Sequence, residues 1–140
     1  MRRILPFVLL AACASHKSHN SDNRLIDRNW IDRMPETERD RLHVYRFVPT
    51  MGGGVFQDRT LYKGTFELFM FKTDGDELQF DLPETHQKVT SRFRIEEVDG
   101  PEPFDLKLTI DVDPRGPHIY YGMSAETDRD GTKLEARLQH

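Results

Sequence analysis

Strict alternation of apolar and polar residues is the feature that most constrains how this chain can fold. From Phe104 to Val112 every second residue is large and apolar, and polar residues stand between them. Successive side chains of a β-strand point to opposite faces of a sheet, so this pattern buries one face and leaves the other in water. The segment predicts a half-buried strand, and the same period of two recurs along the chain after residue 40.

Six further segments alternate in this way and are expected to be strands. They are residues 42–48, 61–72, 78–82, 89–96, 119–123 and 134–138. Turn sequences separate them, among them Asp74-Gly75, Asp99-Gly100-Pro101 and Asp130-Gly131, and Asp-Gly pairs favour tight hairpins. We therefore predict an all-β domain, an antiparallel up-and-down barrel or meander of about seven to eight strands. A closed barrel and an open sandwich are both compatible with the pattern.

The expected strand at residues 61–72 carries bulk on both faces, as does the one at residues 42–48. Phe66, Leu68 and Met70 point one way. Phe69 and Phe71 point the other way, so we expect this strand to be covered on both sides.

The glycine-rich run Met51-Gly52-Gly53-Gly54-Val55 is expected to be a loop between strands. It lacks the lysine-serine ending and the following helix of a phosphate-binding loop. In a barrel it could hang over one mouth, where ligands of such folds enter.

The segment before the first expected strand contains apolar residues among many charges. From Leu25 to Met34 their spacing fits one or two helical turns that end before Pro35. We expect a short helical or irregular N-terminal lead-in, with Trp30 packed against the domain.

The first 12 residues have the three-part layout of a secretory signal. Arg2 and Arg3 precede an apolar stretch from Ile4 to Ala12 that ends in small residues. The nine residues of this stretch are too few for a membrane-spanning helix, which needs about 20 apolar residues. A lipoprotein signal, an ordinary cleaved signal with a chance cysteine nearby, and a buried core strand of a cytosolic protein are the three interpretations.

The single cysteine of the chain, Cys13, favours the first of these. The sequence Leu10-Ala11-Ala12-Cys13 resembles the lipobox of bacterial lipoproteins. The resemblance implies that a signal peptidase cuts between Ala12 and Cys13, and that the thiol of Cys13 receives a diacylglycerol. Acylation of the new amino terminus would add a further chain, and two or three chains on one residue anchor a protein stably.

This interpretation divides the chain into a signal peptide (1–12), a lipidated cysteine with a flexible polar tether (13–23) and a single β-rich domain (24–140). The tether lacks large apolar residues and should stay flexible. We expect the protein in the bacterial cell envelope, with the membrane as a partner through the lipid anchor. Ala14, where an aspartate would signal inner-membrane retention in enteric bacteria, favours the outer membrane, facing the periplasm.

The acidic balance of the chain bounds its partners. The net charge is −4, and loss of two arginines with the signal makes it −6. Such a charge argues against nucleic acid as a partner.

No sequence motif indicates catalysis, a metal or a cofactor, so we predict a protein that is not an enzyme and uses neither. His16 and His19 lie in the tether without further ligands. Asp128 to Thr132 matches a phosphatase string but is better interpreted as a hairpin turn, and Ser124 lacks the second glycine of a nucleophile elbow.

The domain weakly resembles the lipocalin-like small β-barrels. The resemblance rests on Trp30 before the first long strand, followed by hairpins over residues 41–138. The family's Gly-x-Trp motif would place glycine where Arg28 stands, and Arg137 could be the late arginine that stacks on the tryptophan. The resemblance implies binding of a small apolar ligand, at residues that the sequence does not identify. The alternative is an accessory lipoprotein that docks an envelope protein and has no small-molecule ligand.

Overall fold

The computed structural model describes residues 21–126 and 132–139. Ala12 and Cys13, the signal segment and the expected turn at 130–131 lie outside the described residues. The elements are η1 (Asn23–Leu25), β1 (Asn29–Ile31), β2 (Leu42–Val48), η2 (Pro49–Met51), β3 (Gly53–Arg59), β4 (Gly64–Asp74), β5 (Glu77–Leu82), β6 (Gln87–Glu97), β7 (Leu106–Ile110), β8 (Ile119–Gly122) and α1 (Thr132–Leu138).

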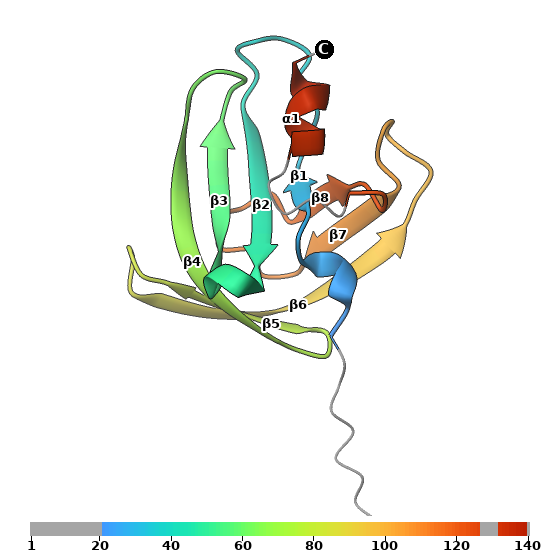
Figure 1. Cartoon of the computed structure of the whole chain (residues 1–140). Helices are drawn as coiled ribbons and strands as arrows, with labels where there is room; N and C mark the ends of the chain where they lie inside the picture. The colour runs from blue at the N-terminus through green and yellow to red at the C-terminus, as the bar shows by residue number, and fades with distance from the viewer. Residues whose placement is uncertain (1–20, 127–131, 140) are drawn as a thin grey trace, which may run out of the picture.

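The strands form a closed antiparallel barrel in simple up-and-down order, β1 to β8 (Figure 1). Each strand pairs with the next one along the chain. A single residue pair, Ile31 with Tyr121, joins β1 to β8 and closes the ring. The predicted all-β fold is confirmed, and the barrel is the form that it takes.

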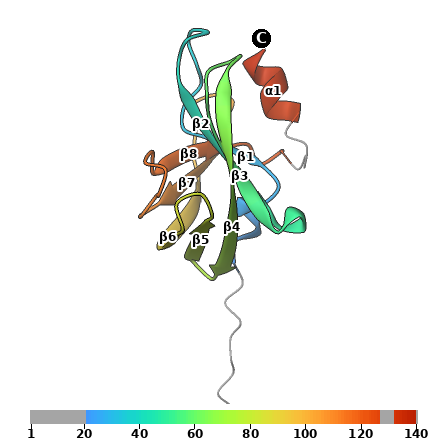
Figure 2. The same ribbon diagram turned by 90° about the vertical axis from the view of Figure 1, so that its left-hand side faces the viewer.

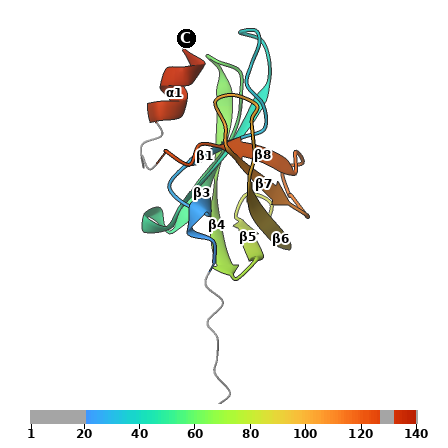
Figure 3. The same ribbon diagram turned by 90° about the vertical axis from the view of Figure 1, so that its right-hand side faces the viewer.

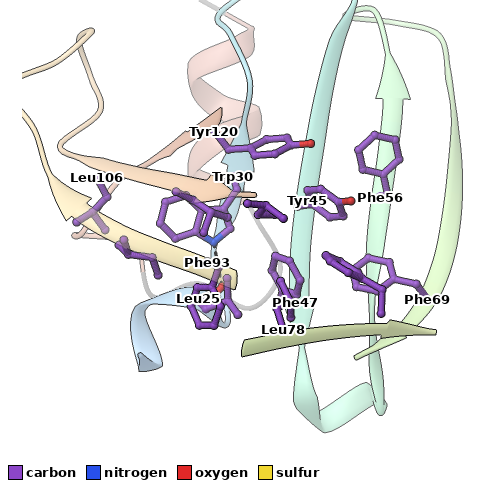
Figure 4. Close-up of a cluster of buried hydrophobic side chains, with 14 of the residues drawn as sticks. Leu25, Trp30, Tyr45, Phe47, Phe56, Phe69, Leu78, Phe93, Leu106 and Tyr120 are labelled. Atoms are coloured by element: carbon purple, nitrogen blue, oxygen red, sulfur yellow. Dashed lines mark hydrogen bonds between the residues drawn. The ribbon is translucent and has the colours of Figure 1, made fainter. Parts of the chain in front are cut away.

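The barrel interior is filled mainly with aromatic rings (Figure 4). Tyr45 stands at the centre, with its ring centroid 4.8 Å from that of Phe56 and 5.1 Å from that of Tyr120. The largest side chains with less than 2 % exposure in or against this core are Trp30, Tyr45, Phe47, Phe69, Phe80, Leu25, Leu78, Leu106, Leu108 and Tyr120. An eight-stranded barrel is just wide enough to be filled in this way or to hold one small ligand.

A second apolar cluster lies on the outside of the barrel, beneath α1. Leu134 and Leu138 of α1 pack with Ile31, Leu42 and Val44 of β1 and β2. Figures 2 and 3 show α1 standing against the outer wall. β2 is therefore buried on both faces, with Tyr45 and Phe47 inside the barrel and Leu42 and Val44 in the outer cluster.

The expected strand at residues 134–138 was wrong, because this segment belongs to α1. Leu134 and Leu138 are separated by four positions, a spacing that fits one face of a helix as well as a strand. The apolar outer face of β1 and β2 selects the helix, since both leucines can then be buried against it.

The lead-in is also less helical than predicted. Only the short 3-10 turn η1 forms, and Trp30 lies within β1. The predicted burial of Trp30 is confirmed, since its side chain has no exposed surface. Residues 29–31 instead pair with residues 44–46 of β2, which places the Trp30 ring in the core of the barrel.

The glycine run is partly strand rather than loop. Gly53 and Gly54 begin β3 and are buried. A Cβ atom on Gly54 would lie 2.4 Å from Cζ of Phe69, so only glycine lets this ring pack against β3.

The expectation that β4 is covered on both faces was wrong. Phe69 is buried on the inner face, but Phe66, Leu68 and Met70 on the outer face are 65 %, 54 % and 49 % exposed. The outer helix α1 packs against β1 and β2 instead, so these three apolar side chains face solvent.

Candidate functional site

Trp30 and η1 close one end of the barrel interior. The indole Nε1–H of Trp30 donates a hydrogen bond to the carbonyl oxygen of Leu25, at 2.9 Å. Leu25 is 1 % exposed, and the neighbouring Arg24 donates to the carbonyl of Ile95 on β6. The lead-in is thereby tied across the barrel end.

The loop between β7 and β8 reaches into the interior through a buried carboxylate. Asp113 accepts hydrogen bonds from the hydroxyl groups of Tyr45, at 2.8 Å, and Tyr120. The backbone N–H groups of Arg115 and His118 also donate to it, at 2.9 and 3.0 Å. Four donors thus satisfy a carboxylate that is only 8 % exposed.

The neighbours of this carboxylate keep it in place. Burial, and then the negative charge of Asp113, raise the pKa of both the Tyr45 and the Tyr120 phenol, so both remain neutral donors. Arg115 stacks over the ring of Phe56, 5.3 Å from its centroid, and pairs with Glu67 of β4. We call Asp113, Tyr45 and Tyr120 the latch.

The packed axis and the latch leave little room for a ligand inside. A cavity of molecular size next to the central side chains would give them accessible surface, yet Trp30, Tyr45 and Tyr120 have none. The surface that could act on another molecule is therefore the outer wall.

The outer wall carries an uncovered apolar surface, which we call the β3–β4 face. Its members, with their exposed fractions, are Met51 68 %, Tyr62 76 %, Phe66 65 %, Leu68 54 % and Met70 49 %. The turn containing Met51 lies against Met70, because a Cβ atom on Gly52 would be 3.7 Å from the Met70 methyl carbon. Exposed apolar residues that gather in one place mark interaction sites more often than scattered ones do.

Two hollows adjoin this face. A half-open groove of about 410 Å³ is lined by Met70, Phe71 and Phe80, with Lys72 and Lys88 beside them. A second groove, of about 390 Å³, shares Phe71 and Lys72 and extends to residues 21–26. Both grooves therefore combine apolar residues with charges of both signs, since Asp81 also lines the first and Asp22 the second.

Polar side chains gather near the start of β2 and the end of β3. Nδ1 of His43 lies 2.8 Å from the Asp32 carboxylate, and its Nε2 lies 3.6 Å from Asp58. Arg41 pairs with Asp58 as well. Ser124, the serine weighed as a nucleophile, instead donates to Asp105. Within residues 21–126 and 132–139 no cluster of three or more His, Cys, Asp or Glu side chains could hold a metal ion.

A buried carboxylate, Glu126, lies beside β1. It accepts from the backbone N–H and the side-chain amide of Asn29, at 3.0 and 2.6 Å, and lies 3.8 Å from Arg46. Burial raises its pKa, against the opposing effect of the Asn29 hydrogen bonds and of the two nearby arginines. This group ties the segment before α1 to the first strand.

The arginine over Trp30 is not the one that the lipocalin resemblance suggested. The guanidinium of Arg28 lies 5.9 Å from the Trp30 ring centroid. Arg137 is exposed on α1. The residue that departs from the family's Gly-x-Trp motif thus supplies the cation.

Comparisons with known proteins add no family to these observations. A scan against protein-family models finds no match, and searches of curated proteins and of solved structures find none either. In the described part of the chain, no helix is long and apolar enough to cross a membrane.

The sequence did not identify the β3–β4 face. Phe66, Leu68 and Met70 were expected beneath a cover, and only the exposed fractions show that they have none. Their alternation with Phe69 and Phe71 was the available signal, but it does not tell which face is buried.

The latch generates a prediction about stability. Tyr45→Phe or Tyr120→Phe should each lower the free energy of unfolding by about 1–3 kcal/mol, because Asp113 stays buried with one donor fewer. Urea unfolding followed by tryptophan fluorescence measures this. Tyr62→Phe is the control and should change stability by less than about 0.5 kcal/mol, since Tyr62 is 76 % exposed. Equal stability of all three variants would contradict a structural role of the latch.

Proposed function

We propose that this protein is a lipid-anchored envelope lipoprotein whose β3–β4 face docks a protein partner. The exposed apolar side chains of that face are the observation on which the proposal depends. The packed interior supports it, because it leaves the outer wall as the surface available for binding.

The proposed anchor suits such a role. Residues 21–26 line a groove next to the β3–β4 face, and Cys13 precedes Ser21 by eight positions. An extended chain of that length reaches at most about 28 Å. A domain tethered in this way would present the face close to the membrane surface, where an envelope partner would meet it.

Docking through this face predicts position-specific crosslinking in cells. A photo-crosslinking residue at position 66 or 68 should give a discrete crosslinked product, because these side chains would be buried in the complex. The matched control is position 112, since Val112 is 55 % exposed and Leu68 is 54 %. Crosslinks of equal yield from positions 68 and 112 would show that the face has no special role.

The anchor predicts covalent labelling at one residue. Cells supplied with radioactive palmitate should label the wild-type protein, and Cys13→Ser should abolish the label, because the chain has no other cysteine. Ser21→Ala, a neighbouring change that leaves Cys13 intact, should retain it. Persistent label on Cys13→Ser, or none on the wild type, would remove the lipoprotein assignment.

Binding of a small apolar ligand is the second candidate function. The groove of about 410 Å³ with its apolar residues and Lys88 favours it as the site, in place of the barrel interior. A fluorescent fatty-acid analogue should then bind with a Kd of roughly 1–10 µM, and Met70→Asp should weaken binding about tenfold or more. Val112→Asp is the control that should bind normally. Absence of saturable binding would leave docking as the function.

A further inference from the structure

β5 pairs with only part of the length of β4. Residues 64–69 of β4 pair with β3, from Gly64 with Arg59 to Phe69 with Gly54. On the other side, β5 pairs with β4 only from Met70 to Asp74. Figure 2 shows β5 beside the lower part of β4 alone. Within the described residues, the segment Gly64–Phe69 therefore has no strand on its second side.

Such a half-open edge is unusual in a closed barrel, which normally leaves no unpaired strand. Unpaired N–H and C=O groups along an extended backbone are a template for another strand. The outward side chains of this edge are Phe66 and Leu68, the central members of the β3–β4 face. Backbone and side chains thus offer the same incoming strand both hydrogen bonds and apolar contact.

We propose that the occupant of this edge is the same edge of a second copy, so that two barrels join through antiparallel pairing of their β4 strands. This inference rests on the proposed docking function and names its partner. Antiparallel pairing of identical segments has two-fold symmetry, which makes the contact self-complementary and closed at two copies.

The charge distribution suits a second copy. Each chain has a net charge of −4, so two copies repel one another over most of their surface. The outward positions at the edge and beside it on β3 are Gly64, Phe66, Leu68, Val55, Gln57 and Arg59. Arg59 alone among them is charged, and it is paired with Glu135 of α1. Glu67, the one acidic residue of the edge, points inward and is paired with Arg115.

Side-chain chemistry also selects the register. Opposite residues in a pair share a face, so a symmetric pairing centres on one residue. Centring on Glu67 would set two carboxylates directly opposite each other, which is destabilising. Centring on Phe66 stacks the two Phe66 rings and sets Leu68 opposite Gly64 and Glu67 opposite Thr65. The five residue pairs of this register, from Gly64 with Leu68 to Leu68 with Gly64, all lie in the part of β4 that does not pair with β5.

Two differently tagged copies of the full chain, purified in detergent, test the pairing. The wild-type copies should co-purify, and Phe66→Lys should reduce co-purification about tenfold or more, because two ammonium groups then meet at the axis. Phe66→Glu should fail in the same way. A mixture of Phe66→Lys with Phe66→Glu should restore the pair, since opposite charges now meet. Val112→Lys, at a comparably exposed position, is the control that should pair normally.

The outcomes separate this inference from the proposed function. Restored pairing in the charge-swapped mixture supports the second copy and the register. Wild-type copies that do not co-purify, or a mixture that stays unpaired, overturn it. If crosslinks from position 66 still give a discrete product with a different protein, docking stands without the second copy. If neither pairing of the two copies nor a discrete crosslink from position 66 is observed, the proposed docking function is overturned as well.

Discussion

Close packing of aromatic rings along the barrel axis is the constraint on which the rest of this structure depends. Tyr45 contacts rings from four other strands, and its hydroxyl donates a hydrogen bond to the buried Asp113. A close-packed interior of this kind excludes solvent and leaves a small barrel without room for a guest molecule. The ends follow from the same packing, since Trp30 holds η1 and the latch holds the β7–β8 loop. The binding surface that we propose is therefore on the outer wall.

The outer wall is divided between a covered and an uncovered part. α1 buries the apolar residues of β1 and β2, and the ion pair of Arg59 with Glu135 links it to β3. The next apolar surface, on β3 and β4, has no such cover within the described residues. The same strand β4 is paired only in part with β5. An uncovered face and a half-open edge on one strand are the physical basis for proposing that this protein works by docking at a membrane surface.

Much of the fold was predictable because alternation is a local property. Residues 104–112 and 78–82 show one buried face directly, and Asp-Gly turns between alternating segments indicate hairpins. The errors occurred where local spacing allows two structures. Leu134 and Leu138 fit a strand or a helix, and the outer face of β1 and β2 decided for the helix. Gly53 and Gly54 were expected in a loop, yet they open β3, where the ring of Phe69 occupies the space that a side chain at position 54 would need. The candidate site was missed for a related reason, since the two apolar faces of β4 are alike in sequence.

The sequence by itself determined the all-β class, the succession of strands from β4 to β8, the burial of Trp30 and the prediction of lipidation at Cys13, whereas it did not indicate β1 or β3. Each depends on the identity or spacing of neighbouring residues. Only the tertiary structure decided that the barrel is closed, that its axis is filled and that Phe66, Leu68 and Met70 face solvent. These properties depend on which distant segments pack together. Burial of an apolar side chain is set by whether another element covers it, and α1 covers β2 rather than β4.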